Sequence, residues 1–215
     1  MFEAVIFDMD GVLVDSEPVI EEAARRGLAE YSVDARHEDF LPFVGAGEDR
    51  YIGGVAEKYG LAYKTEMKRR VYEIYLEIVD GMIRTYPGVV RVLQGLRAAG
   101  VRLALASSAD RIKVEANLRA AGIPEALFDA LVSGEDVVNK KPAPDIFLEA
   151  ARRLAIGPAR CAVVEDAVNG VRAAKAAGMF CVALTTSFPV EALRAAGADR
   201  VEPDLAGAFA ALSEF

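Results

Sequence analysis

The sequence has little of what several classes of protein need. It carries 25 basic against 33 acidic residues, and its net charge of −8 argues against nucleic acid or an anionic membrane surface as a partner. No apolar run reaches the roughly 20 residues that a membrane-spanning helix needs. The first residues also lack the basic stretch, the apolar stretch and the small-residue cleavage site of a secretory signal. Together these features predict a cytoplasmic protein.

Cysteine and histidine are nearly absent, with two cysteines and one histidine in 215 residues. Cys161 and Cys181 both lie in apolar runs typical of strands, so we expect two buried thiols rather than a disulfide or a metal site. Apolar residues are abundant at 53%, with 27% charged residues, which is typical of a globular protein with a substantial core. The sequence does not determine the oligomeric state, and a monomer is compatible with it.

The second half of the sequence alternates between helical and strand-like segments. Four helical patterns end in Ala-Ala-Gly, in which alanine favours the last turn of a helix and glycine the left-handed residue just past it. Short apolar runs typical of buried strands lie at 101–108, 161–166 and 179–186. This alternation predicts an α/β fold, a Rossmann-like parallel sheet with helices on both faces.

Residues 16–84 interrupt the alternation, because they are rich in charge and contain no convincing buried strand. Ser16 is suited to cap the first of their helices. The helical patterns lie near 16–31, 48–60 and 66–79.

We therefore expect an α/β catalytic core formed by residues 1–15 and 85–215, with residues 16–84 inserted as an all-helical cap. A helical excursion of this length from an α/β core is typical of an active-site lid, which would hinge near 14–16 and 82–86. A packed helical subdomain without motion is the alternative.

Polar side chains follow the predicted strands. Asp8 and Asp10 come directly after the first apolar run, 4–7. Right-handed crossovers place the carboxyl end of every parallel strand at one edge of the sheet, where α/β proteins bind ligands. We expect four loops to meet at this edge. Besides the two aspartates, they contribute Ser107 and Ser108, Lys140 and Lys141, and Glu165 and Asp166.

The acidic residues at this edge require a cation. Asp8, Asp10, Glu165 and Asp166 would raise one another's pKa values unless positive charge neutralised them. Oxygen ligands favour a hard cation, and Mg²⁺ takes one or two carboxylates together with phosphate and water. The sequence therefore predicts a magnesium site.

The remaining polar residues are suited to bind phosphate. Lys141 is a cation, Ser107 offers a hydroxyl, and the residues around Ser108 offer backbone N–H groups near a helix start. Each signal alone has an ordinary reading as a turn, a helix cap or a solvated surface. Their coincidence at one edge favours phosphoryl transfer to a carboxylate.

Four short motifs contain these polar residues. They are DMDGVLVDSE at 8–17, ASS at 106–108, KKPAPDIF at 140–147 and VVEDAVNGVRAAKAAGM at 163–179. In this order the motifs resemble those of the haloacid dehalogenase-like hydrolase superfamily, and they cover the whole predicted core. The helical insert after the first motif resembles the type-1 cap of the branch that contains phosphatases and β-phosphoglucomutases.

The resemblance implies a role for each motif residue. Asp8 is implied as the nucleophile that becomes an aspartyl phosphate, and Asp10 as the general acid and base. Ser107 and Lys141 would hold the transferring phosphoryl group. Asp15 and Glu17 would belong to the hinge and the first cap helix. The implied Mg²⁺ ligands are Asp8, the backbone carbonyl of Asp10, Glu165 and Asp166.

Within the superfamily, the acid at Asp10 favours a phosphate ester, since the dehalogenases and phosphonatases lack it. The mutases carry a histidine where this chain has Ile20 and a lysine where it has Val44. The only histidine, His37, lies elsewhere, and Arg50 is one residue from the position of the mutase arginine. These departures favour a phosphatase over a mutase.

We therefore expect Mg²⁺-dependent hydrolysis of a small phosphate monoester, a sugar phosphate or a similar metabolite, through an aspartyl phosphate. A β-phosphoglucomutase-type transfer is the alternative. A catalytically idle binding module is a further one, which the intact motif residues disfavour. The candidates for substrate contact in the cap are Gly45, Gly47, Glu48 and Arg50.

Overall fold

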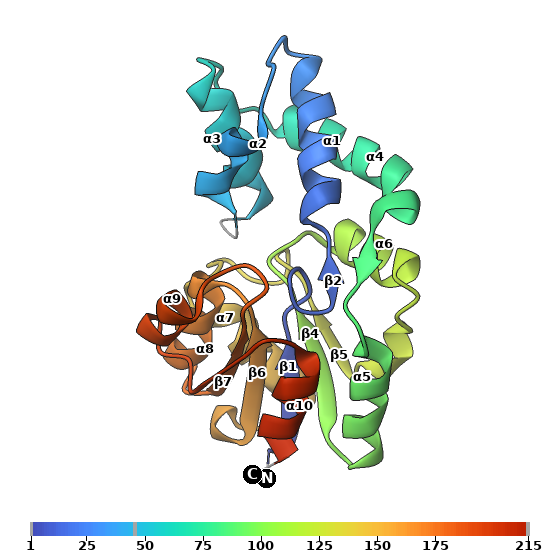
Figure 1. The fold of residues 1–215 in the computed structure, drawn as a ribbon, viewed down its shortest axis with the longest axis vertical. Helices are drawn as coiled ribbons and strands as arrows, with labels where there is room; N and C mark the ends of the chain where they lie inside the picture. The colour runs from blue at the N-terminus through green and yellow to red at the C-terminus, as the bar shows by residue number, and fades with distance from the viewer. Residues whose placement is uncertain (1, 45–46, 214–215) are drawn as a thin grey trace.

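The computed structural model describes residues 2–44 and 47–213, and its centre is one parallel sheet (Figure 1). Six strands lie in the order β5-β4-β1-β6-β7-β8, with every neighbouring pair parallel. This confirms the predicted α/β fold, and β5 and β8 extend the sheet beyond the four apolar runs seen in the sequence. The strands are β1 Ala4–Phe7, β4 Arg102–Ala106, β5 Ala130–Val132, β6 Cys161–Glu165, β7 Phe180–Leu184 and β8 Arg200–Glu202.

Helices cover both faces of the sheet because successive strand side chains point to opposite sides. Val5 and Phe7 join a cluster with α5, α6 and α10, whereas Ala4 and Ile6 join one with α7, α8 and α9. The covering helices are α5 Val89–Ala98, α6 Arg111–Ala120, α7 Asp145–Leu154, α8 Val168–Ala176, α9 Val190–Ala195 and α10 Leu205–Ser213. Short 3₁₀ helices lie at η2 Glu125–Leu127 and η3 Pro158–Arg160.

The details of these elements follow the sequence pattern. The four glycines that end the Ala-Ala-Gly patterns all have positive φ, as their position after a helix predicts. Cys161 and Cys181 are free thiols buried in the sheet, as expected. Among the described helices, none is both long and apolar enough to cross a membrane.

The helices between residues 17 and 82 have an apolar cluster of their own. Helix α1 packs along α4, and Tyr75 of α4 is among the largest side chains buried in this cluster. Helix α4 also packs against α6, so the helical segment contacts one of the helices that cover the sheet. The segment consists of α1 Glu17–Ala29, α2 His37–Phe40, η1 Leu41–Phe43, α3 Glu48–Lys58 and α4 Thr65–Met82.

Two short strands join this helical segment to the sheet. β2 (Val14–Asp15) pairs antiparallel with β3 (Arg84–Thr85), and the pair lies between the helices at the top of Figure 1 and the sheet below them. That these links bend, and that residues 16–84 move as a separate domain, stay predictions. Ser16 differs from expectation, because it makes no capping bond to α1 and instead donates its hydroxyl to Asp10.

Candidate active site

The carboxyl ends of β1 and β6 bring three carboxylates together. Asp8 directly follows β1, Glu165 ends β6, and Asp166 is the next residue. One oxygen of each carboxylate lies within 4.8 Å of the other two, and all three residues are buried. Parallel pairing of β1 with β6 therefore creates the acidic cluster that the sequence predicted.

Lys141 supplies positive charge inside this cluster. Its Nζ lies 2.5 Å from Asp8 Oδ1 and 2.6 Å from Glu165 Oε1, and its side chain is 7% exposed. Burial disfavours the charged amine, but the two carboxylates outweigh it and hold the pKa of Lys141 above its ordinary value. The ammonium is therefore a fixed cation beside the Asp8 carboxylate.

One ammonium leaves the cluster with an excess of negative charge. Burial, assisted by Glu165 and Asp10 and opposed by Lys141, raises the pKa of Asp8 to about 7. Burial and the neighbouring carboxylates also raise the pKa of Asp166 well above its usual range. Carboxylates in this state take up either protons or a further cation.

Two glycines hold the carboxylates of the cluster against bare backbone. At Gly11, where φ is 81°, a Cβ would lie 1.9 Å from Asp166 Oδ2. At Gly170, in the first turn of α8, a Cβ would lie 1.7 Å from Glu165 Oε1. The backbone N–H groups of Asp166 and Ala167 also donate to Glu165 Oε2, both at 2.7 Å. Fixed, buried carboxylate oxygens with surplus negative charge fit a hard divalent cation such as Mg²⁺.

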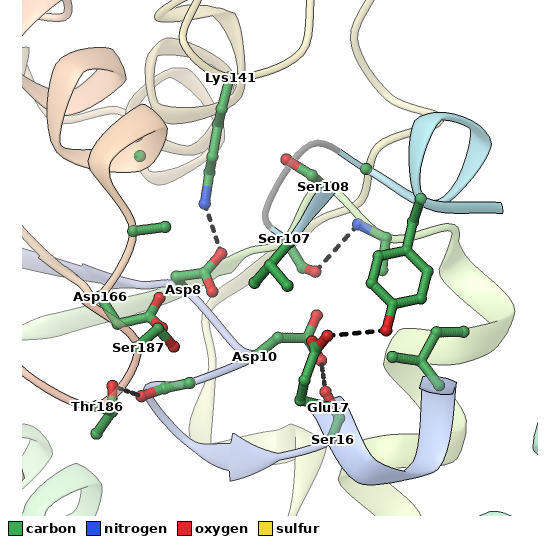
Figure 2. A pocket seen from close by; sticks show the side chains of 18 of the residues that line it. Asp8, Asp10, Ser16, Glu17, Ser107, Ser108, Lys141, Asp166, Thr186 and Ser187 are labelled. Carbon is green, nitrogen blue, oxygen red and sulfur yellow. Dashed lines mark hydrogen bonds and ion pairs between the residues drawn. The ribbon is translucent and has the colours of Figure 1, made fainter. Parts of the chain in front are cut away.

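Asp10 belongs to a separate hydrogen-bond network (Figure 2). Its Oδ1 accepts hydrogen bonds from Ser16 Oγ and from Asn117 Nδ2, the latter at 3.3 Å. Lys113 Nζ lies 3.2 Å from the same oxygen. The carboxylate of Asp10 thus lies outside the cluster around Asp8, and a metal role for this residue would fall to its backbone carbonyl.

Lys113 is a residue of this network that the sequence reading missed. Its side chain is 5% exposed, and its Nζ lies 3.1 Å from Glu48 Oε1 at the start of α3. Burial disfavours the charge, but Asp10 and Glu48 outweigh it and raise the pKa of Lys113 well above its ordinary value. One buried ammonium therefore joins the loop after β1 to the helical segment.

A signal for Lys113 does exist in the sequence. Lys113 and Asn117 are four residues apart, each directly before an apolar residue of the core, Val114 and Leu118. Residues at this spacing share one face of a helix, so both polar side chains are turned inward with the apolar ones. Ile112, by contrast, is 48% exposed.

The predicted phosphate-binding residues lie near Asp8. Ser107 and Ser108 follow β4, the strand that pairs with β1 on the side opposite β6. The Ser107 hydroxyl is buried and accepts the backbone N–H of Ala109 at 3.1 Å. The structure therefore brings both serines and Lys141 to one cavity with Asp8.

That cavity has a volume of about 410 Å³, and the helical segment lines one side of it. The sheet side contributes the carboxylate cluster, Asp10, both serines and Lys141. Tyr86 and Thr186 also line the cavity. The helical segment contributes Glu17, Ile20, Leu41, Phe43, Val44, Gly47, Glu48 and Tyr51.

The predicted cap contacts have different positions. Gly47 and Glu48 line the cavity, whereas Gly45 lies outside the described residues. Arg50 is not in the described lining: its Nη1 pairs with Glu57 Oε2 at 2.8 Å, and its side chain is 55% exposed. The structure therefore does not bring Arg50 into the site.

Glu17 and Tyr51 are lining residues that the sequence reading did not place in the site. Glu17 begins α1, as expected, yet its side chain accepts the Tyr51 hydroxyl at 2.9 Å within the cavity wall. The contact depends on how α1 and α3 pack against each other, so neither residue carries a local signal for it.

Comparison with known proteins decides the family. A family model of the haloacid dehalogenase-like hydrolases matches residues 2–178. The chain belongs to this family. The predicted membership of this superfamily is thereby confirmed.

Individual relatives agree with the family. SUPPRESSOR OF QUENCHING 1 of Arabidopsis thaliana, a chloroplastic protein, is 43% identical over 94% of this chain and 20% of its own length. The phosphorylated carbohydrates phosphatase of Thermotoga maritima is 37% identical over 82% of each chain. The crystal structure of CbbY from Rhodobacter sphaeroides with phosphate has a TM-score of 0.83 at 31% identity and covers 96% of this chain and 99% of that one. Two of the curated relatives are much longer, since this chain spans 20% and 52% of their lengths.

Proposed function

We propose that this chain is a phosphatase that hydrolyses a small phosphate monoester, such as a sugar phosphate, with Mg²⁺ and through an aspartyl phosphate. The observation that carries the proposal is the buried cluster of Asp8, Glu165 and Asp166 with Lys141 inside it, open to a cavity. Relatives named as phosphatases of phosphorylated carbohydrates and of hexitols support this substrate class. The cytoplasmic location stays a prediction.

Asp8, Glu165 and Asp166 would hold the Mg²⁺, with the backbone carbonyl of Asp10. When bound, the ion supplies positive charge that offsets the repulsion between a carboxylate and a phosphate dianion. The glycine-backed positions of Glu165 and Asp166 support this assignment, because preformed ligands need no rearrangement.

In the first step, an oxygen of Asp8 forms a bond to phosphorus while the bond from phosphorus to the ester oxygen breaks. Lys141 and Ser107 hold the oxygens of the transferring group, where negative charge accumulates. Asp10 gives its proton to the departing alcohol oxygen. In the second step, Asp10 takes a proton from the water that attacks phosphorus and releases Asp8. We expect this acid–base role of Asp10 to accelerate the reaction by about 10²–10⁴-fold.

Phosphoryl transfer between two positions of a sugar is the alternative reaction. The described lining of the cavity carries the apolar Ile20 and Val44 where the mutases have a histidine and a lysine. The single histidine, His37, is bonded to Glu21 at the surface instead. A described lining without the histidine and the lysine of the mutases supports hydrolysis over transfer.

Phosphate release from p-nitrophenyl phosphate and a panel of monoesters, with Mg²⁺ or with EDTA, tests the proposal. We expect Mg²⁺-dependent release. Formation of glucose 6-phosphate from β-glucose 1-phosphate faster than phosphate release would identify a mutase. No release from any ester would identify an idle module.

A further inference from the structure

The helical side of the cavity presents carboxylates to the substrate. Glu17 comes from the start of α1 and Glu48 from the start of α3, and both line the cavity. Figure 2 shows Glu17 beside Asp10, which is the side on which the alcohol part of an ester would leave. The environment of the leaving group is therefore set by acidic side chains.

The Glu17 carboxylate has a fixed position. Its Oε1 accepts the Tyr51 hydroxyl at 2.9 Å. Burial is the main cause that raises the pKa of Glu17, and the hydrogen bond from Tyr51 and the charge of Lys113 compensate it only in part. The Tyr51 hydroxyl and the charge of Lys113 therefore stabilise the charged form of Glu17 only in part.

The cations of the described lining are already paired. Lys141 contacts Asp8 and Glu165. Lys113 lies between Asp10 and Glu48 at 3.2 and 3.1 Å. Neither ammonium is left to neutralise a second anionic group on the substrate.

Two basic residues near the cavity do not supply the missing positive charge either. Arg50 pairs with Glu57 and lies over the ring of Phe43, 5.0 Å from its centroid, but is not itself in the described lining. Lys140 is outside the described lining, with its Nζ 3.5 Å from the carbonyl of Ser108. The rest of the helical wall is apolar and aromatic, with Ile20 and Phe43 among its residues.

We propose that the substrate is a phosphate monoester whose alcohol part carries hydroxyl groups and no second anionic group, and that Glu17 determines this selectivity. The inference rests on the proposed function. A substrate hydroxyl can donate to Glu17 beside Tyr51, whereas a second phosphate or a carboxylate would meet Glu17 and Glu48 without a counter-charge. Such juxtaposition of like charges discriminates against a ligand without any need for tighter binding of the right one.

Matched pairs of esters test the substrate class. Racemic glycerol 3-phosphate and racemic 3-phosphoglycerate differ in one CH₂OH or carboxylate group. Fructose 6-phosphate and fructose 1,6-bisphosphate differ in one phosphate. We expect kcat/KM to be at least about 10-fold higher for the less charged member of each pair, the scale of one unscreened like-charge contact. Equal efficiencies, or a preference for the more charged member, would overturn the inference.

The assay with p-nitrophenyl phosphate separates this inference from the proposed function. If no ester releases phosphate, the proposed function fails. If p-nitrophenyl phosphate is hydrolysed but the matched pairs do not differ, the inference about the substrate fails while the phosphatase stands.

Two variants test the role of Glu17. Glu17→Gln keeps the shape and an oxygen that can accept from Tyr51, and we expect it to reduce the ratio of kcat/KM within each pair by about 10-fold, mainly through a lower KM for the more charged ester. Glu66→Gln makes the same change of charge at an exposed site on α4 and should leave both ratios unchanged. If Glu17→Gln has the same ratio of kcat/KM within each pair as wild type, Glu17 does not determine the selectivity. If Glu17→Gln does not fold, Glu48→Gln and the wild-type ratio still test the anionic wall.

Discussion

At the scale of single residues, Asp8 and Asp10 are two aspartates with the same local sequence signal and different surroundings. They flank Met9, which is buried in the core, and both follow β1. Asp8 lies against Lys141 in the acidic cluster, whereas Asp10 accepts hydrogen bonds from Ser16 and from Asn117 of α6. The separation fits a nucleophile and a proton carrier that must act on opposite ends of the same bond.

Asp8→Asn tests the nucleophile. An amide keeps the shape of the side chain but loses the charge that attacks phosphorus, so kcat should fall by at least about 10³-fold with the fold retained. Phosphate release measures the loss, a thermal melt controls for the fold, and mass spectrometry excludes deamidation back to aspartate. Turnover above a tenth of wild type would contradict the assignment.

At the scale of helices and strands, the sheet side of the site could be predicted from the sequence. Apolar runs give the strands, and the rule that parallel strands end at one edge brings Asp8, Ser107, Lys141 and Glu165 together without any knowledge of packing. The helical side could not be predicted in the same way. The inward position of Lys113 and the turn of Arg50 toward solvent depend on how the helical segment packs, which no local pattern records.

Helix α8 makes room for the carboxylate of Glu165 because it has a glycine, Gly170, at the point of contact. Gly170→Ala would place a Cβ where Glu165 Oε1 now lies, so we expect the carboxylate to shift. The Mg²⁺ concentration for half-maximal activity should rise, and kcat/KM should fall by about 10- to 100-fold, as for loss of support around a metal. A Mg²⁺ titration of activity measures both.

Gly81→Ala is the matched control for Gly170→Ala, because it makes the same change in another helix. Gly81 lies in α4, where an added Cβ meets nothing within 4 Å. The change should leave the Mg²⁺ titration unaltered and stabilise the protein by up to about 1 kcal/mol through helix propensity. If Gly170→Ala leaves the Mg²⁺ titration unaltered, the present position of Glu165 is not required for Mg²⁺-dependent activity.

The contact between α6 and α3 predicts a large effect on stability. Lys113→Met fills the space but strands the carboxylates of Asp10 and Glu48, so the free energy of unfolding should fall by about 3–5 kcal/mol. Urea unfolding measures it. Lys175→Met is the control, because its partially exposed pair with Asp199 should contribute no more than about 1 kcal/mol.

A double variant identifies the cause of this loss. Adding Glu48→Gln to Lys113→Met removes one of the stranded charges, so part of the lost stability should return. If the free energy of unfolding of Lys113→Met is no lower than that of Lys175→Met, the buried ion pair does not hold the two parts of the chain together.

At the scale of the whole molecule, the two parts of the chain divide the work of the site. The sheet edge supplies the acidic cluster, and the helical segment supplies the opposite wall of the cavity. In the proposed function, the first would hold the phosphoryl group and the second would meet the rest of the substrate. The parts are connected through β2 and β3 and through the buried Lys113. In the proposed function, the groups that do the chemistry and the groups that select the substrate therefore lie on separate segments of the chain, and Lys113 links them by pairing with both Asp10 and Glu48.

The acidic cluster also predicts how the stability of the protein depends on pH. Asp8 has a pKa of about 7 in the folded protein against 3.8 for the ordinary group, and the pKa of Asp166 is raised as well. The folded state thus holds protons more tightly than the unfolded chain between these values, so stability without metal must fall as pH rises toward and through 7. Bound Mg²⁺ replaces the protons and should cancel this loss.

We therefore expect the rise in thermal midpoint caused by Mg²⁺, relative to EDTA, to be larger at pH 8 than at pH 5, because protons compete with the metal at the lower pH. His37, whose pKa is raised by its bond to Glu21, also loses stabilising interaction over this range. Its contribution is the same with and without Mg²⁺, so the difference between the two melts isolates the cluster. Asp8→Asn should shrink that difference, because it removes a carboxylate that both titrates and binds metal. An Mg²⁺-induced shift of equal size at pH 5 and pH 8 would rule out the cluster as the metal site.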